Sequence, residues 1–199
     1  VWPTVRAVLA RAASPSARAA TAAQLVDQWV ATGSSRLDGD LDGKIDAPGA
    51  AVLDGAWPLI ADTVLRDVLG LLTPQLVALV KPDDAPGPTG SAYLDGWYSY
   101  VEKDLRGLLQ PRPKTPFLNK YCGRGDAAAC ASSLWLAIDR AAAQLEQAQG
   151  TTPSAWRADA TKERIAFAPG LLRRTMRWTN RPTFQQAISF DSHRPRSSR

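Results

Sequence analysis

Apolar residues recur along this chain at spacings of three and four, which is the pattern of amphipathic α-helices. A short helix is expected over "TVRAVLARAA" (4–13), and a second helix over 15–32, with Ser14 as N-cap, Pro15 at its first position and Gly33 as its end. Four stripes are expected to face a core: Ala22, Leu25, Val26, Trp29 and Val30; Trp57, Ile60, Val64, Val68 and Leu71; Trp97, Val101, Leu105 and Leu108; Cys130, Leu134, Ile138, Ala141 and Leu145. The chain therefore reads as mostly helical.

Proline and glycine interrupt this pattern at three places. Pro58 is expected to kink or restart the helix that holds the second stripe. The segment "KPDDAPGPTG" (81–90) is the best internal boundary within one domain over 1–199. The segment 110–125 is expected to be irregular because it holds three prolines.

The C-terminal part changes from helical to extended character. A closing strand or hairpin is expected at about 175–190, where Phe184, Ile188 and Phe190 fall on one side. A lone strand is not stable in water, and the sequence offers no other convincing strand to pair with it. The sequence therefore predicts that the fold is incomplete and that this strand joins a sheet from outside the chain.

Composition narrows the class of protein. The chain has 199 residues, 45% of them hydrophobic and seven of them Trp, which is enough for one packed core. The net charge of +5 comes largely from arginines near the C-terminus. No nucleic-acid-binding motif accompanies these arginines, so we interpret them as a solvated end.

No apolar run reaches membrane-spanning length. The first residue is Val1, and the sequence is expected to be a processed chain or a piece of a longer one.

An aspartate-rich segment, "LDGDLDGKIDAPGA" (37–50), is the best candidate for a metal site. Asp38, Asp40 and Asp42 fit the first, third and fifth positions of an EF-hand calcium loop, with Gly43 at the sixth, Lys44 offering its carbonyl at the seventh and Asp46 at the ninth. The twelfth position, which needs a bidentate Glu, holds Gly49. Two interpretations stay open: a structural calcium site, or a polar turn in which Asp46 caps the following helix.

The two cysteines, Cys122 and Cys130, are expected to form a short-loop disulfide. No zinc ligand set is completed near the two cysteines, because the only histidine is His193. A disulfide would favour an exported protein. The usual nucleophilic catalysts cannot be assembled either, since His193 lies in a tail that we expect to fray. The sequence thus offers no catalytic residue.

Three segments, in this order, resemble the C-terminal part of the penicillin acylase family: "AAQLVDQWVATG", "LDGDLDGKIDAPGAAVLDGAW" and "MRWTNRPTFQQ". The resemblance covers roughly residues 3 to 193. It implies an N-terminal nucleophile hydrolase with a four-layer αββα sandwich, exported as a precursor that cuts itself into two chains. The implied reaction is hydrolysis of an acyl amide, in a penicillin or an N-acyl homoserine lactone.

The resemblance places the catalytic residues outside this chain. The family's nucleophile is a serine at the start of its larger chain, whose own α-amine acts as base. Residue 1 here is Val, and Asn180 belongs to the closing motif, not to the oxyanion hole. The implied partners are the small chain and the N-terminal part of the large chain, together with a small acyl amide substrate. The implied location is extracytoplasmic. The alternative is a non-catalytic helical module with a calcium-stabilised loop that binds a partner.

Overall fold

The computed structural model describes residues 1–40, 42–73, 96–110 and 120–160, together with strands at 164–165, 176–177, 187–191 and 194–198. The expected boundary at 81–90, the motif at 178–186 and His193 lie outside the described residues. The described α-helices are α1 (Trp2–Leu9), α2 (Ala17–Ala31), α3 (Pro48–Leu69), α5 (Gly96–Leu109) and α6 (Ala127–Gln149). The short 3₁₀ helices are η1 (Gly70–Leu72), η2 (Cys122–Gly125) and η3 (Pro153–Ala155).

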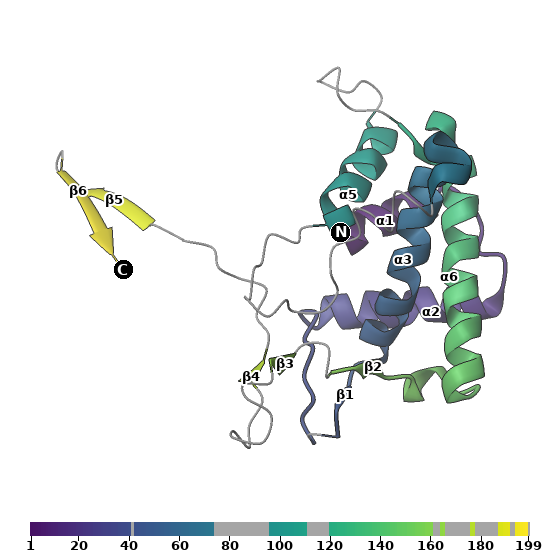
Figure 1. Cartoon of the computed structure of the whole chain (residues 1–199), viewed down its shortest axis with the longest axis horizontal. Helices are drawn as coiled ribbons and strands as arrows, with labels where there is room; N and C mark the ends of the chain where they lie inside the picture. The colour runs from purple at the N-terminus through teal and green to yellow at the C-terminus, as the bar shows by residue number, and fades with distance from the viewer. Residues whose placement is uncertain are drawn as a thin grey trace.

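The helices pack as a bundle around one core. Figure 1 shows α3 and α6 alongside each other, with α2 crossing them, and these three helices pack against one another. Helix α5 packs against α1 and α3. The largest fully buried side chains come from all of these helices and from the segments between them: Leu9, Val26, Ile45, Ile60, Leu105, Leu134, Ile138 and Trp156. The mostly helical fold predicted from the apolar stripes is therefore confirmed.

The described strands are short and pair only two at a time. β1 (Lys44–Ile45) pairs with β2 (Ala158–Asp159), β3 (Arg164–Ile165) pairs with β4 (Met176–Arg177), and β5 (Ala187–Asp191) pairs with β6 (Arg194–Ser198). All three pairs are antiparallel. The prediction of a C-terminal strand is confirmed over β5. The prediction that the chain holds no partner for it was wrong, because the Arg- and Ser-rich tail forms β6.

The start of α2 differs from the predicted one, and α1 ends earlier than predicted, at Leu9. The N-cap of α2 is Ser16 and not Ser14, because the Ser16 hydroxyl accepts a hydrogen bond from the Ala19 N–H (3.0 Å). Pro15 therefore precedes the helix, and the Ser14 hydroxyl donates to the Ser16 carbonyl (2.8 Å). Of the two expectations for Pro58, a kink or a restart, the restart is wrong, because α3 continues through Pro58 to Leu69. Proline removes one N–H donor, and packing of the buried faces on both sides of Pro58 outweighs that loss.

The apolar stripe of α3 ends earlier than its periodicity indicated. Ile60 and Val64 are fully buried, whereas Leu71 is 93% exposed. Between them Gly70 adopts a positive φ of +54°, which ends the helix and turns the chain. The first residue beyond that glycine therefore no longer follows the helical period.

Candidate functional site

The aspartate loop lies between α2 and α3 and is anchored on its inner side. Ile45 is 1% exposed and pairs with Ala158 of β2. Two further backbone hydrogen bonds close the loop, from the Asp46 N–H to the Leu37 carbonyl and from the Ala160 N–H to the Gly43 carbonyl (both 2.9 Å). The loop is therefore held by the core and by strand pairing, and its acidic side faces outward.

Three carboxylates of this loop lie close together. One oxygen each of Asp38, Asp40 and Asp42 lies within 4.8 Å of the others. The Gly43 N–H donates to Asp38 Oδ2 (3.2 Å), and Gly43 has a φ of +88°, which glycine adopts readily. The Lys44 N–H donates to Asp42 Oδ1 (2.8 Å). Clustered carboxylates of this kind suit a hard cation such as Ca²⁺.

Asp46 and Gly49 occupy the ninth and twelfth positions of the predicted calcium loop. Asp46 does not cap α3, whose N-cap is Ala47 without a side-chain hydrogen bond, so that prediction was wrong. Instead, Asp46 Oδ2 accepts from the Gly39 N–H (3.0 Å), which closes the loop across its base. At the twelfth position, a Cβ added to Gly49 would lie 2.4 Å from the Leu25 carbonyl oxygen and 2.5 Å from Trp29 Cβ. The close packing of α3 on α2 therefore excludes the usual Glu.

The predicted disulfide is present. Cys122 and Cys130 are bonded, with Cα atoms 5.1 Å apart, and both residues are fully buried. Cys130 lies in the first turn of α6, and Cys122 begins η2. The bond therefore fixes the turn at 121–125 to the N-terminal end of the longest helix in the described residues.

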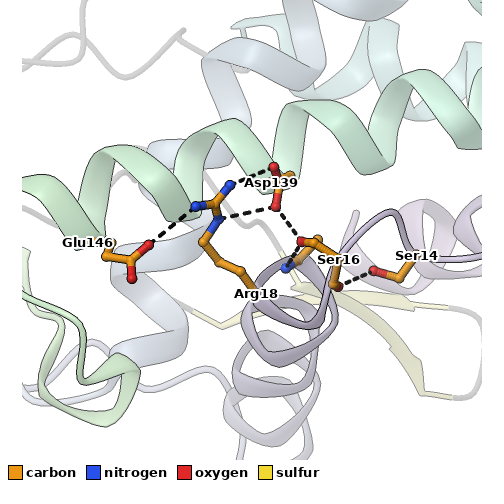
Figure 2. Close-up of polar contacts among 6 residues, drawn as sticks. Ser14, Ser16, Arg18, Asp139 and Glu146 are labelled. Atoms are coloured by element: carbon orange, nitrogen blue, oxygen red, sulfur yellow. Dashed lines mark hydrogen bonds and ion pairs between the residues drawn. The ribbon is translucent and has the colours of Figure 1, made fainter.

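A polar cluster that the sequence did not reveal joins α2 to α6 (Figure 2). Arg18 donates two hydrogen bonds to the Asp139 carboxylate (3.1 and 2.8 Å) and one to Glu146 (3.3 Å). The Ser16 hydroxyl also donates to Asp139 (2.5 Å). Hydrogen bonds from Arg18 first, and from Ser16 second, hold the pKa of Asp139 below its usual value. The seven-residue spacing of Asp139 and Glu146 places both on one helix face, which is the signal that could have indicated the cluster.

This cluster has a serine and a carboxylate in contact but lacks the means to activate the serine. A general base needs a pKa near the working pH, and the pKa of Asp139 is lowered. The Ser16 oxygen is also engaged as the cap of α2. The arrangement thus stabilises the α2–α6 contact and does not form a nucleophilic site.

A shallow groove of about 310 Å³ runs between α3 and α6. Its lining mixes apolar side chains such as Leu136 with charged ones, including Arg140 and the Arg66–Asp62 ion pair (2.6 Å). Its two hydroxyl groups belong to Thr63 and Ser133, and Thr63 donates to the Leu59 carbonyl (2.7 Å). No histidine or cysteine lines it. Within the groove, the Asp62 carboxylate is engaged by Arg66, and the Thr63 hydroxyl by the backbone of its own helix.

None of the described helices combines the length and the apolar character that crossing a lipid bilayer requires.

The comparison with models of protein families and the comparison with curated proteins found no match to this chain.

Proposed function

We propose that this chain is the C-terminal structural part of a penicillin acylase-like amidohydrolase, whose nucleophile lies on an upstream segment. The observation that carries the proposal is a difference between two parts of the chain. The helices enclose one hydrophobic core of their own, whereas β3–β4 and β5–β6 each form a two-stranded sheet that joins no larger sheet among the described residues. A two-stranded ribbon is marginally stable at best in water. Such ribbons favour addition to a larger sheet, which the αββα sandwich of the family would supply.

Two further features support this proposal. The three sequence segments that resemble the family occur in the expected order, and the first two of them form α2, the aspartate loop and the start of α3. The serine–carboxylate contact of the helical body, Ser16–Asp139, caps α2 and joins it to α6, which is compatible with catalytic residues on an upstream segment. In this proposal the body packs on the sandwich, and a small acyl amide reacts elsewhere.

The proposed location is extracytoplasmic. Stable structural disulfides form and persist in oxidising compartments and are rare in the cytosol. Cys122 and Cys130 are bonded in the structure. This bond therefore supports the secreted or periplasmic location that the family resemblance implies.

Co-expression with the upstream half of the same gene tests the proposal. The assay measures amine release from a phenylacetyl or long-chain acyl amide. We expect no turnover by the chain alone, and both a stable complex and turnover when the upstream half is supplied. Deletion of 176–199 should abolish the complex, because it removes β4, β5 and β6. The control, Lys103→Gln, changes an exposed side chain of the helical body outside the aspartate loop and should leave turnover intact.

Two outcomes would contradict this proposal. The first is turnover by the isolated chain that is lost in His193→Ala, which would place a catalytic base in this chain. The second is a folded, soluble upstream half that neither binds this chain nor gains activity from it. The first result would make this chain a catalyst by itself, and the second would leave the helical module as the better interpretation.

A second candidate function is a helical module stabilised by calcium at the aspartate loop. The specific observation in its favour is the convergence of Asp38, Asp40 and Asp42 within 4.8 Å. Ca²⁺ takes six to eight oxygen ligands. The three carboxylates and the Lys44 carbonyl can supply part of this set, and water must complete it because Gly49 excludes a twelfth-position carboxylate. We therefore expect weak binding, with a Kd of about 10⁻⁴ to 10⁻³ M.

Calorimetry and thermal unfolding test the calcium site. With a Kd of about 1 mM, about 10 mM Ca²⁺ should stabilise the fold by roughly 1.4 kcal/mol. The Asp40→Ala variant should lose both the heat of binding and the stabilisation. The control variant Asp62→Asn removes a carboxylate on the exposed face of α3 and should retain both. Equal heats in the wild type and Asp40→Ala would leave the loop as a polar turn only.

A further inference from the structure

Helix α5 is held to the bundle by an apolar stripe that contains one charged residue. Val101, Leu105 and Leu108 of this stripe are buried. Asp104 lies among them and is only 4% exposed. A buried carboxylate is tolerated only when donors compensate for its lost hydration. The attachment of α5 therefore depends on what Asp104 contacts.

Asp104 contacts the disulfide-containing turn that follows α5 in the chain. Its carboxylate accepts hydrogen bonds from the backbone N–H groups of Tyr121 (2.6 Å) and Cys122 (3.1 Å). The next N–H, that of Gly123, donates to Asp67 Oδ2 on α3 (2.8 Å). Three successive N–H groups of one turn are thus bound by carboxylates from two helices. Hydrogen bonds to ionised acceptors are stronger than neutral ones.

The same turn is fixed to a third helix, α6. The Cys122–Cys130 disulfide supplies the covalent link. Gly123 provides close contact, because a Cβ added there would lie 2.5 Å from the Cys130 nitrogen. Gly123 also has a φ of +59°, which disfavours other residues. The orientation in which the turn presents its N–H groups to Asp104 therefore depends on its attachment to α6.

We propose that residues 121–123 form a redox-sensitive latch that holds α5 to the bundle. With the disulfide intact, the turn stays against α6 and satisfies Asp104. A dithiol reductant cleaves the S–S bond: the dithiol becomes a disulfide, and Cys122 and Cys130 become two thiols that carry the two protons. The turn then gains freedom, Asp104 loses its donors, and α5 separates from α1 and α3 while the α2–α3–α6 packing persists. Because both cysteines are buried, reduction requires a prior opening of the turn.

Hydrogen exchange of the full chain, followed by mass spectrometry, tests the latch. The oxidised wild type is compared with the dithiothreitol-reduced wild type and with the Cys122→Ala/Cys130→Ala variant. We expect exchange at amides of 101–109 to rise at least about tenfold in both disulfide-free forms, and amides at 134–142 of α6 to change less than about twofold.

A second comparison is made entirely in the oxidised chain and does not depend on the cysteine variant. Asp104→Asn replaces one carboxylate oxygen by an NH₂ group, which cannot accept from the turn. We expect it to raise exchange at 101–109 by a similar factor. The control Lys103→Gln, an exposed neighbour on the same helix, should change neither region.

Three results would overturn the latch. If α6 amides accelerate as much as α5 amides after disulfide loss, the bond acts on the whole fold through the unfolded chain. If α5 exchange is unchanged after disulfide loss, the turn does not control α5. If Asp104→Asn leaves α5 exchange unchanged, the carboxylate does not transmit the effect.

Discussion

The packing of α3 on α2 at Gly49 gives the sharpest test of the structure. Replacing Gly49 by Ala would place a Cβ 2.4 Å from the Leu25 carbonyl oxygen and 2.5 Å from Trp29 Cβ. Neither atom can move by a simple side-chain rotation, because one belongs to the backbone and the other is attached to it. The first turn of α3 must therefore shift away from α2.

The expected change in the free energy of unfolding for Gly49→Ala is the sum of two opposing effects. Overpacking of this kind costs about 1–3 kcal/mol. Alanine gains up to about 1 kcal/mol over glycine in helix propensity, and less near a helix end. The net effect of Gly49→Ala should be a loss of about 1–2 kcal/mol in the free energy of unfolding. For a chain of this size, that corresponds to a Tm lower by about 2–8 °C.

Gly55 provides a matched control within the same helix. A Cβ added there would meet only Ala141 Cβ, at 3.8 Å, which is ordinary van der Waals contact. Gly55→Ala should therefore raise the free energy of unfolding by about 0.5–1 kcal/mol through propensity alone. Thermal and urea unfolding, followed by far-UV circular dichroism, measure both variants. The reasoning is refuted if Gly49→Ala is as stable as the wild type, or if both substitutions shift stability in the same direction.

Two further predictions concern the cluster of Figure 2. Ser16→Ala removes the cap of α2 and the hydrogen bond to Asp139, and should lower the free energy of unfolding by about 1–2 kcal/mol in urea titrations. Arg18→Gln should lower the free energy of unfolding only slightly at neutral pH, because the ion pairs of Arg18 are partly exposed to solvent. The folded-state pKa of Asp139 is lowered, so this stabilisation is present above the unfolded value of about 3.9 and is lost as pH falls through the folded pKa. A wild type–Arg18→Gln difference that grows toward acid pH would contradict the assignment.

The helices were predictable because their signal is local and repeated. The stripe from Cys130 to Leu145 specifies one face of α6 through residues only three or four positions apart, and its members are buried or pack against the core. The same reasoning failed at Leu71, where the apolar spacing continues past Gly70 but the helix does not. Periodicity carries no information on the backbone angle of a single glycine, and that angle decides where the face ends.

The cap of α2 was mispredicted for a different reason. Ser14 and Ser16 are equally suited to capping by residue type, and Pro15 favoured the first. The structure selects Ser16, whose hydroxyl also bonds Asp139, 123 positions further along the chain. That contact exists only once α6 has packed against α2. The choice between Ser14 and Ser16 was therefore made by tertiary structure, which a local pattern does not contain.

The aspartate loop contains one feature that the local sequence predicts and one that only packing determines. The cluster of Asp38, Asp40 and Asp42 around Gly43 was predictable because residues five positions apart define it. The role of Asp46 was not, because proximity to α3 suggested a cap, whereas the fold directs its carboxylate back to the Gly39 N–H. The sequence thus predicts the acidic side of the loop, and packing determines how the loop closes.

Helix α3 links this loop to the disulfide turn. Its first turn lies against α2 at Gly49, and near its other end Asp67 accepts the Gly123 N–H. Between these points Ile60 and Val64 are fully buried and fix the rotation of the helix about its axis. A rotation that relieved a clash at Gly49 would also move Asp67 away from the turn. Strain introduced at the first turn of α3 should therefore be transmitted along this helix to the disulfide turn.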